Sequence, residues 1–227
     1  MVEEVVTKDK LIGHAGTRLL IPAMNMTDGK VQMFKTPHNP NFLRDLHLSA
    51  VDVAMATSAA PLYFPLAKIG SRLYADGGLF ANSPDLCAIH EACHFCEVAR
   101  DDIRLLSIGT TSSRCALPGS IDPEMGQSAW LENERLTTSV FSAQQQLVDF
   151  IVGHQLKDRY VRLDSEPSSE QMTDLGLDLA DKGRRDTLLG LAEGVFQKAI
   201  GKPEVRAFLE HAAPRQDYSE KLRMGQA

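Results

Sequence analysis

The sequence is poor in cysteine and lacks any long hydrophobic run. Four of its 227 residues are cysteines, and three of them crowd between positions 87 and 96, which is not the spacing of a disulfide framework. No stretch approaches the roughly 18 apolar residues that a membrane-spanning helix needs. The acidic first ten residues lack the apolar core of a secretory signal. We therefore expect reduced thiols and a cytoplasmic location.

Positive charge is scarce as well. The formal net charge is −6, and lysines and arginines form no block, so the basic footprint that nucleic-acid binding requires is missing. An acidic protein can still contact a membrane surface peripherally, through apolar side chains. Hydrophobic residues make up 43% and charged residues 24%, which is typical of a globular domain and excludes disorder, collagen and coiled coil.

Apolar spacing and turn residues predict alternating strands and helices. Asp28-Gly29 suits the positive φ of a turn between the first two strands, and Ser83 with Pro84 predicts a capped helix start. The alternation predicts an α/β fold with a mostly parallel sheet, and no linker divides the chain. The predicted strands lie at residues 18–26, 30–35, 71–75, 103–108 (buried on both faces) and 159–163, and the predicted helices at residues 46–57, 83–99, 136–156, 187–200 and 204–212.

The first candidate site is the tripeptide Asp76-Gly77-Gly78, which follows a predicted strand. Two glycines permit positive φ and leave no Cβ, so the chain can turn sharply and another group can approach the carboxylate. Strand ends are also where α/β sheets bind ligands. An ordinary strand-to-loop turn has the same pattern, so the tripeptide alone does not decide between the two readings.

The neighbouring residues add to this pattern. Residues 56–61 read ATSAAP, Phe64-Pro65 follows, and Asn82-Ser83-Pro84 comes after the tripeptide. This order resembles the patatin-like phospholipase family, in which an ATSAAP–x–x–FP segment precedes a DGG or DGA motif and an x-N-N-P helix start. The likeness covers about residues 17–200, and residues 55–85 are its specific part. Leu62-Tyr63-Phe64, between two prolines, fits either an exposed apolar lip for acyl chains or a buried loop.

The resemblance implies a three-layer α/β/α sandwich that hydrolyses acyl esters of lipids with a Ser–Asp dyad, without histidine, metal or cofactor. By position, Asp76 would be the base and Gly77-Gly78 its turn. The serine would stand on a G-x-S-x-G turn, and a G-G-G-x-R-G loop would bind the oxyanion. This chemistry is coherent, because a serine hydroxyl needs an adjacent base and the oxyanion needs preorganised donors.

The sequence departs from the family pattern in several places. It contains no G-x-S-x-G and no G-G-G-x-R-G, and the one glycine pair at that spacing, Gly190 and Gly194, has Ala192 at its centre. Ser83 stands where a second Asn is usual, and Thr111 where the family often has Gly. In the family the serine and the oxyanion loop precede the segment seen here. We therefore expect residues 1–227 to be a single C-terminal portion of the domain, incomplete on its N-terminal side.

A missing nucleophile costs on the order of 10⁶ in rate in serine hydrolases, so we expect no significant acyl hydrolase activity from this chain alone. Three situations fit: a fragment of a longer enzyme, one half of a split enzyme whose serine lies on a second polypeptide, or a truncated product. A non-catalytic interaction domain is a further alternative, because an incomplete sheet exposes an edge and an apolar face.

A zinc-dependent hydrolase is the remaining alternative. Residues 90–94, His90-Glu91-Ala92-Cys93-His94, match H-E-x-x-H, in which two histidines on one helix face bind Zn²⁺ and the glutamate activates water. No third ligand follows at the usual spacing, and an unmarked residue such as Glu124 would have to supply it. A packing helix with His90 and His94 at its border explains the same residues, and we expect no bound metal.

Overall fold

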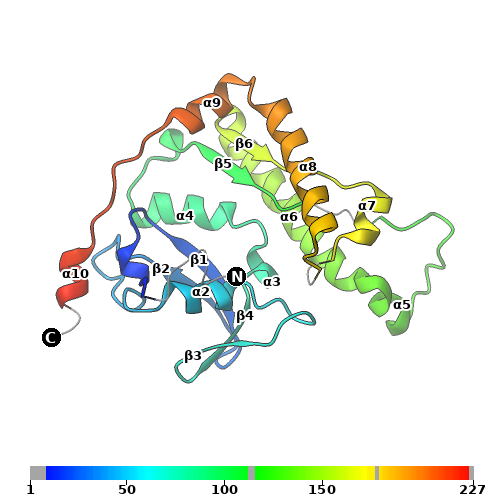
Figure 1. The fold of residues 1–227 in the computed structure, drawn as a ribbon, viewed down its shortest axis with the longest axis horizontal. Coiled ribbons are helices and arrows are strands. Elements are labelled where there is room, and N and C mark those ends of the chain that lie inside the picture. The colour runs from blue at the N-terminus through cyan, green and yellow to red at the C-terminus, as the bar shows by residue number, and fades with distance from the viewer. Residues whose placement is uncertain (1–8, 112–115, 177–178, 225–227) are drawn as a thin grey trace. The chain divides into compact units, whose positions relative to one another are not determined.

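The computed structural model describes residues 9–111, 116–176 and 179–224 (Figure 1). They pack as two compact units. Unit 1 comprises the chain up to Ile103 together with the residues from Ala212 onward, and unit 2 comprises Arg104–His211. No helix within the described ranges is long and apolar enough to cross a membrane. The α/β class is confirmed, and the single-domain expectation stays a prediction.

Unit 1 is built on a four-stranded sheet with the order β2-β1-β4-β3. The strands β1 (Leu20–Asn25) and β2 (Lys30–Lys35) pair antiparallel. The turn between them places Gly29 at φ 64°, a conformation that glycine adopts without steric cost. The predicted strand–turn–strand unit is therefore confirmed.

The two other strands form a second hairpin. β3 (Ala67–Ile69) pairs antiparallel with β4 (Arg72–Asp76), and β4 also pairs antiparallel with β1. The mostly parallel sheet that we expected is wrong for this unit, because a two-residue turn such as Gly70-Ser71 can join only antiparallel strands. β3 was not predicted, since Pro61 and Pro65 indicated irregular structure, and the strand begins only after them.

The helix α2 (Ala50–Thr57) covers one face of this sheet. It starts later than residue 46 because the Ser49 hydroxyl accepts the amide of Asp52 at 3.4 Å and caps the helix there. The buried cluster between helix and sheet consists of Ala23, Phe34 and Tyr74 from the strands, Val53 and Ala56 from α2, and Ile12 from η1 (Ile12–His14).

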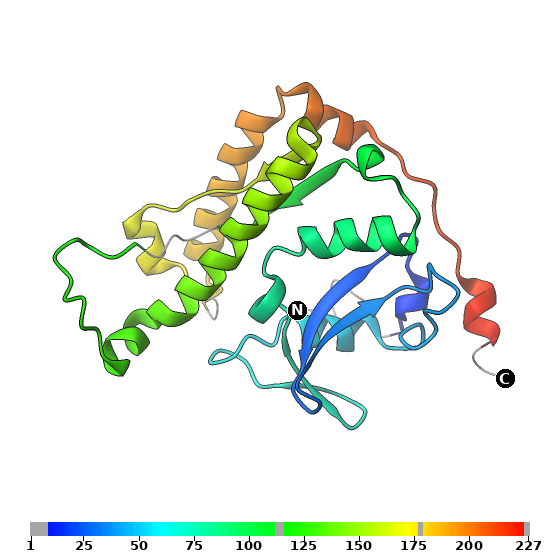
Figure 2. The ribbon, with the colours of Figure 1, turned by 180° about the vertical axis from the view of Figure 1, so that it is seen from behind.

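The helix α4 (Asp85–Phe95) lies on the opposite face, because Lys35 alternates with the core residue Phe34 and reaches α4. The Lys35 ammonium is 2.6 Å from one oxygen of the buried Glu91, and His38 Nε2 is 2.9 Å from the other. Figures 1 and 2 show α2 and α4 on the two sides of the strands. These contacts of Glu91 therefore link α4 to β2 and to the segment that follows it.

The predicted start of this helix is wrong in its detail. A short helix, α3 (Gly78–Ala81), directly follows β4, and Pro84 rather than Ser83 stands at the N-cap of α4. The Ser83 hydroxyl is buried and has no hydrogen-bond partner among the described residues. The helix ends at Phe95 rather than near residue 99, and Glu97 follows in the left-handed region at φ 57°.

The C-terminal segment returns to unit 1, which the sequence did not predict. Its helix α10 (Ser219–Met224) lies beside η1. The amide of Gln216 donates to the carbonyl of Gly16 at 2.9 Å, and Lys221 Nζ donates to the carbonyl of Pro37 at 2.6 Å. Residues at both ends of the described chain therefore belong to the same unit.

Unit 2 contains one parallel strand pair, β5 (Leu105–Ile108) with β6 (Tyr160–Leu163). The long helix α6 (Arg135–Leu156) covers one face, where the Tyr160 hydroxyl donates to Asp149 at 2.8 Å. Val161, on the alternate face, packs with Ala199 and Val205 of α8 (Lys182–Ala199) and α9 (Pro203–Glu210). The remaining elements are η2 (Arg100–Asp102) in unit 1 and α5 (Gln127–Leu131), η3 (Glu132–Glu134), η4 (Lys157–Arg159) and α7 (Ser169–Asp174) in unit 2.

The edge strand β5 is less buried than expected. Ile108 at its end is 71% exposed, although the apolar run had predicted burial on both faces. A parallel pair of two strands is too narrow to cover its own residues, and parallel strands normally belong to larger sheets. The helix α6 and the strand β6, in contrast, match their predictions.

Replacing Glu91 by Ala should weaken unit 1. The substitution leaves the mostly buried Lys35 ammonium without its carboxylate partner, so we expect the free energy of unfolding to fall by about 3 kcal/mol. Urea unfolding followed by circular dichroism measures this change. Glu97→Ala, at an exposed position just beyond the same helix, should change it by less than about 0.5 kcal/mol, and an equal loss in both variants would contradict the structural role of Glu91.

Replacing Gly77 by Ala should also destabilise the chain. A Cβ on Gly77 would clash with the backbone carbonyl of Pro22 in β1, and backbone cannot move aside as a flexible side chain can. We expect a loss of at least about 2 kcal/mol in urea unfolding. At Gly78 the added Cβ would meet the side chains of Asp76 and Asn82 instead. Gly78→Ala should therefore cost less than about 1 kcal/mol, and the reverse order would refute this geometry.

Candidate active site

The carboxylate of Asp76 stands at the end of β4. Its backbone amide donates to the carbonyl of Ala59 at 2.9 Å, which ties the strand end to the segment after α2. One carboxylate oxygen accepts the amide of Gly78 at 2.6 Å. Within the described ranges the second oxygen accepts no hydrogen bond, and Asp76 takes part in no ion pair. The residue is half-buried, so a further donor can approach it.

The two glycines after Asp76 act through their missing side chains. Gly77 lies at φ −65° and ψ −20°, and Gly78 is not among the positive-φ residues. Positive φ is therefore not what these glycines provide here, and the approach of another group to the carboxylate stays a prediction. The amide of Gly77 donates to the carbonyl of Thr57 at 3.4 Å, and its missing Cβ leaves room for the backbone of Pro22.

Burial governs the electrostatics of Asp76. Desolvation raises the pKa of its carboxyl group above the ordinary value, while the hydrogen bond from the Gly78 amide lowers the pKa by a smaller amount. A carboxylate whose charged form is disfavoured is a stronger base than one in water. The arrangement therefore suits proton acceptance near neutral pH better than an exposed aspartate would.

Two neighbours of Asp76 were not assigned a role from the sequence. The Thr57 hydroxyl donates to the carbonyl of Pro22 at 2.6 Å, so Thr57 links α2 to β1 directly beneath the Gly77 turn. The amide oxygen of Asn82 lies 3.3 Å from the position that a Cβ on Gly78 would take, on the same side as the carboxylate of Asp76. Thr57 belongs to the ATSAAP segment and Asn82 to the Asn82-Ser83-Pro84 segment. Their place in these two segments is the only sequence feature that could have pointed to them.

The zinc-site interpretation has little support in the structure. Both oxygens of Glu91 are occupied by Lys35 and His38, whereas His90 and His94 are exposed and stack on each other with ring centroids 5.3 Å apart. Histidines, cysteines and acidic residues form no cluster of three or more that could hold a metal ion within the described part of the chain. The glutamate of the motif therefore serves the core of unit 1.

Three cysteines lie on α4 or directly after it. Cys87, Cys93 and Cys96 are free and partly buried, and Cys115 lies outside the described residues. Burial raises the pKa of the Cys87 thiol, which keeps it in the unreactive protonated form.

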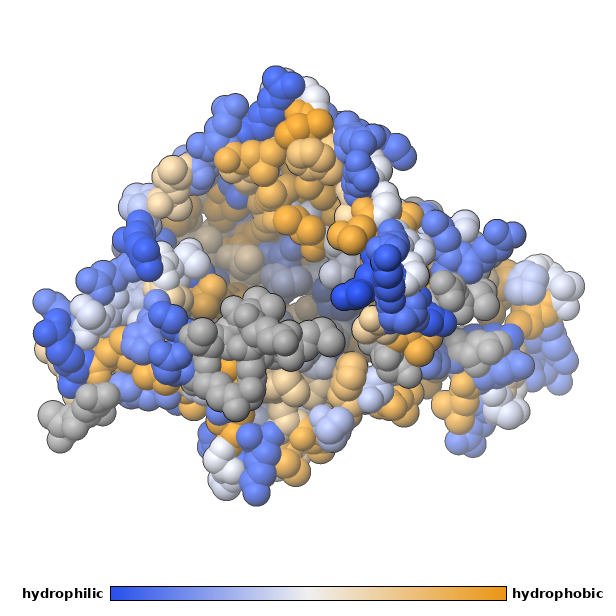
Figure 3. All heavy atoms as spheres, viewed as in Figure 1, coloured by the Kyte–Doolittle hydropathy of each residue, from blue (hydrophilic) through white to orange (hydrophobic). Residues whose placement is uncertain are grey.

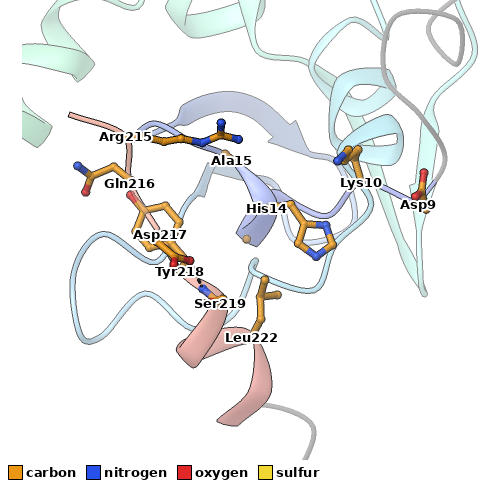
Figure 4. A pocket seen from close by; sticks show the side chains of 11 residues that line it. Asp9, Lys10, His14, Ala15, Arg215, Gln216, Asp217, Tyr218, Ser219 and Leu222 are labelled. Atoms are coloured by element: carbon orange, nitrogen blue, oxygen red, sulfur yellow. Dashed lines mark hydrogen bonds between the residues drawn. The ribbon is translucent and has the colours of Figure 1, made fainter. Parts of the chain in front are cut away.

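A separate pocket of about 500 Å³ lies between η1 and the C-terminal segment (Figure 4). Its lining mixes the cationic side chains of Lys10 and Arg215 with His14 and with the acidic Asp9 and Asp217. Neither Asp76 nor any of its hydrogen-bond partners lines this pocket. The pocket is therefore distinct from the candidate active site.

One departure from the family pattern has a structural consequence in unit 2. Thr111 lies at φ 74°, in the left-handed region that favours glycine. Its amide donates to Asp164 at 3.2 Å, and the same carboxylate binds Arg162 at 2.6 Å. Asp164 thus binds both Thr111 and Arg162, and it stabilises a backbone conformation that a threonine does not readily adopt.

The chain is similar in sequence to known proteins. A family model described as patatin-like phospholipase matches residues 13–86, the segment that contains α2, β4 and Asp76. A "cGAMP-activated phospholipase" from Pseudomonas aeruginosa (strain BWHPSA011 / Pa011) is 36% identical over 217 residues, covering 93% of this chain and 65% of the relative.

Two further relatives carry the same description. The one from Vibrio cholerae serotype O1 (strain ATCC 39315 / El Tor Inaba N16961) is 35% identical over 207 residues, covering 81% of this chain and 58% of the relative. The one from Escherichia coli (strain TW11681) is 31% identical over 240 residues, covering 97% of this chain and 67% of the relative. The chain thus spans about two thirds of its relatives or less, and by this similarity it belongs to the patatin-like phospholipase family.

Proposed function

We propose that this chain is part of a lipid acyl ester hydrolase in which Asp76 is the base of a Ser–Asp dyad. The observation that carries the proposal is the half-buried carboxylate at the end of β4, with one oxygen oriented by the Gly78 amide and the other without a hydrogen bond from the described residues. The serine comes from polypeptide outside this sequence, because no G-x-S-x-G occurs in it.

In this mechanism Asp76 transfers two protons, one in each half of the reaction. It accepts the proton of the serine hydroxyl as the serine oxygen bonds to the ester carbonyl carbon. When the tetrahedral intermediate collapses, the bond to the leaving alcohol breaks and Asp76 donates the proton to that alcohol. Asp76 then accepts a proton from water, whose oxygen attacks the acyl-enzyme, and returns it to the serine as the fatty acid leaves. The hydrogen bond from Gly78 keeps the carboxylate oriented throughout.

Uncovered apolar surface in unit 2 supports the proposal that the chain is the C-terminal portion of one larger domain. Ile108 at the end of β5 and Phe150 on α6 are 71% and 65% exposed. Figure 3 shows a broad hydrophobic area where β5, β6 and α9 reach the surface. Folded proteins rarely leave such surface in water. We infer that further polypeptide, from the same chain or a second one, covers it and brings the serine.

The names of the relatives suggest two partners, which we extend to this chain as proposals. A phospholipase acts on a lipid substrate, so we propose lipid acyl esters as substrates and peripheral contact with a membrane surface. The three relatives are described as activated by cGAMP. Assays of this enzyme therefore need to be run both with and without cGAMP.

Replacing Asp76 by Asn should abolish turnover. In the enzyme that includes the serine-bearing segment, we expect hydrolysis of a phospholipid or a p-nitrophenyl ester to fall at least about 10³-fold, because an amide cannot accept the serine proton. Asp52→Asn changes an exposed carboxylate on α2 and should leave the rate within about two-fold of the wild type. Unchanged rates in Asp76→Asn, or Asp76-dependent hydrolysis by this chain alone, would refute the proposal.

The pH dependence of the reaction tests the state of Asp76 separately. Because burial raises the pKa of this carboxyl group, the acid limb of the kcat/KM profile should lie above the ordinary aspartate pKa of about 3.9. The same shift means that the protonated carboxyl group favours the folded state. This stabilisation is full at low pH and is lost as pH rises through the raised pKa. At neutral pH Asp76→Asn should therefore unfold at no lower urea concentration than the wild type, and an acid limb at or below 3.9 would contradict this account.

A further inference from the structure

The loop between α2 and β3 exposes apolar side chains beside the candidate active site. In residues 61–66, here called the apolar loop, Leu62 is 82% exposed, and Phe64 and Leu66 are exposed as well. The loop starts two residues after Ala59, whose carbonyl accepts the amide of Asp76. Of the two sequence interpretations of this segment, the structure thus favours the exposed lip.

The backbone holds this loop in a defined shape. The amides of Tyr63 and Phe64 both donate to the carbonyl of Ala60, at 3.2 and 2.9 Å, which closes a tight turn. Leu62 at the tip lies at φ 75°, in the left-handed region that a branched side chain adopts only at a cost. The fold therefore keeps a large apolar side chain in water, at a position where glycine would be the easier residue.

The segment that carries the apolar loop differs in charge from the whole chain. The net charge of the chain is −6, yet residues 53–75 contain no acidic residue, and Lys68 and Arg72 are their only charged residues. Both cations lie on the β3–β4 hairpin and are exposed, and Arg72 forms an ion pair at 3.5 Å with Asp28 of the β1–β2 turn. Figure 3 shows hydrophobic and hydrophilic residues side by side at the end of unit 1 where this hairpin lies.

We propose that the apolar loop, together with Lys68 and Arg72, is the surface through which unit 1 contacts a lipid bilayer that carries anionic headgroups. The inference rests on the proposed function, because that function supplies a lipid substrate at Asp76. Leucine and phenylalanine enter the boundary between headgroups and acyl chains, while the two cations remain at the level of the phosphates. The contact places the ester groups of the lipid next to the end of β4.

Vesicle flotation with the full chain tests this surface. We expect more protein to bind vesicles of phosphatidylglycerol and phosphatidylcholine than vesicles of phosphatidylcholine alone. Leu62→Ser should lower the partition coefficient about ten-fold on anionic vesicles. Lys68→Ala should lower it about five-fold on anionic vesicles and leave binding to neutral vesicles unchanged. The matched control is Leu43→Ser, at an exposed apolar position of unit 1 outside the loop, which should bind within about two-fold of the wild type.

Several outcomes would overturn the proposal. They are absence of binding to anionic vesicles, equal loss in Leu62→Ser and Leu43→Ser, or a Leu62→Ser effect on self-association rather than on vesicles, which would assign the loop to a protein partner. Leu62 is so exposed that Leu62→Ser should fold, and its circular dichroism spectrum checks this. Flotation requires no catalytic serine, so Leu62-dependent binding with an unaffected Asp76→Asn turnover would refute the proposed hydrolase and keep the lipid surface. Loss of turnover in Asp76→Asn without Leu62-dependent binding would refute the lipid surface and keep the proposed hydrolase.

Discussion

The contact between the end of β4 and the backbone of β1 determines the rest of the site. A side chain does not fit between them, and the absence of a Cβ on Gly77 lets its backbone lie against Pro22. Thr57 reinforces this contact from α2, through its hydroxyl to Pro22 and its carbonyl to Gly77. This contact also fixes the position of Asp76, the start of α3 and the start of the apolar loop. Each of them lies next to a backbone group that is hydrogen-bonded to Asp76 or Gly77, namely the carbonyls of Ala59 and Thr57.

Local patterns predicted the parts of the fold that depend on neighbouring residues. Asp28-Gly29 identified the first hairpin, and Asp76-Gly77-Gly78 identified the strand end that carries the candidate base. Contacts between distant residues were not predictable in this way. The Ser83-Pro84 pair has the composition of a capped start, yet α3 occupies the preceding turn and leaves the Ser83 hydroxyl buried. The return of α10 to the side of η1 depends on packing, and no local periodicity encodes it.

The H-E-x-x-H segment shows how a chemical motif can serve packing alone. On α4, Glu91 lies on the face toward the sheet, whereas His90 and His94 lie on the exposed side. The sequence shows the four-residue spacing of the histidines but not the partner of the glutamate, because Lys35 and His38 are more than fifty residues away. The motif at Asp76 differs in this respect. The Gly78 amide that orients its carboxylate stands two residues away, and its backbone amide donates to Ala59 in the nearby ATSAAP segment.

Unit 1 is discontinuous in sequence, and this affects the order in which the protein can form. Gln216 and Lys221, which bind Gly16 and Pro37, are synthesised only after the whole of unit 2. On the ribosome the strands β1 to β4 emerge before these partners are synthesised. Unit 2 is inserted between the two sequence segments of unit 1, and these segments associate only after unit 2 has been made. Closing that long loop carries an entropic cost that grows only slowly with its length. The late synthesis of these contacts, more than their distance along the chain, therefore sets when unit 1 is complete.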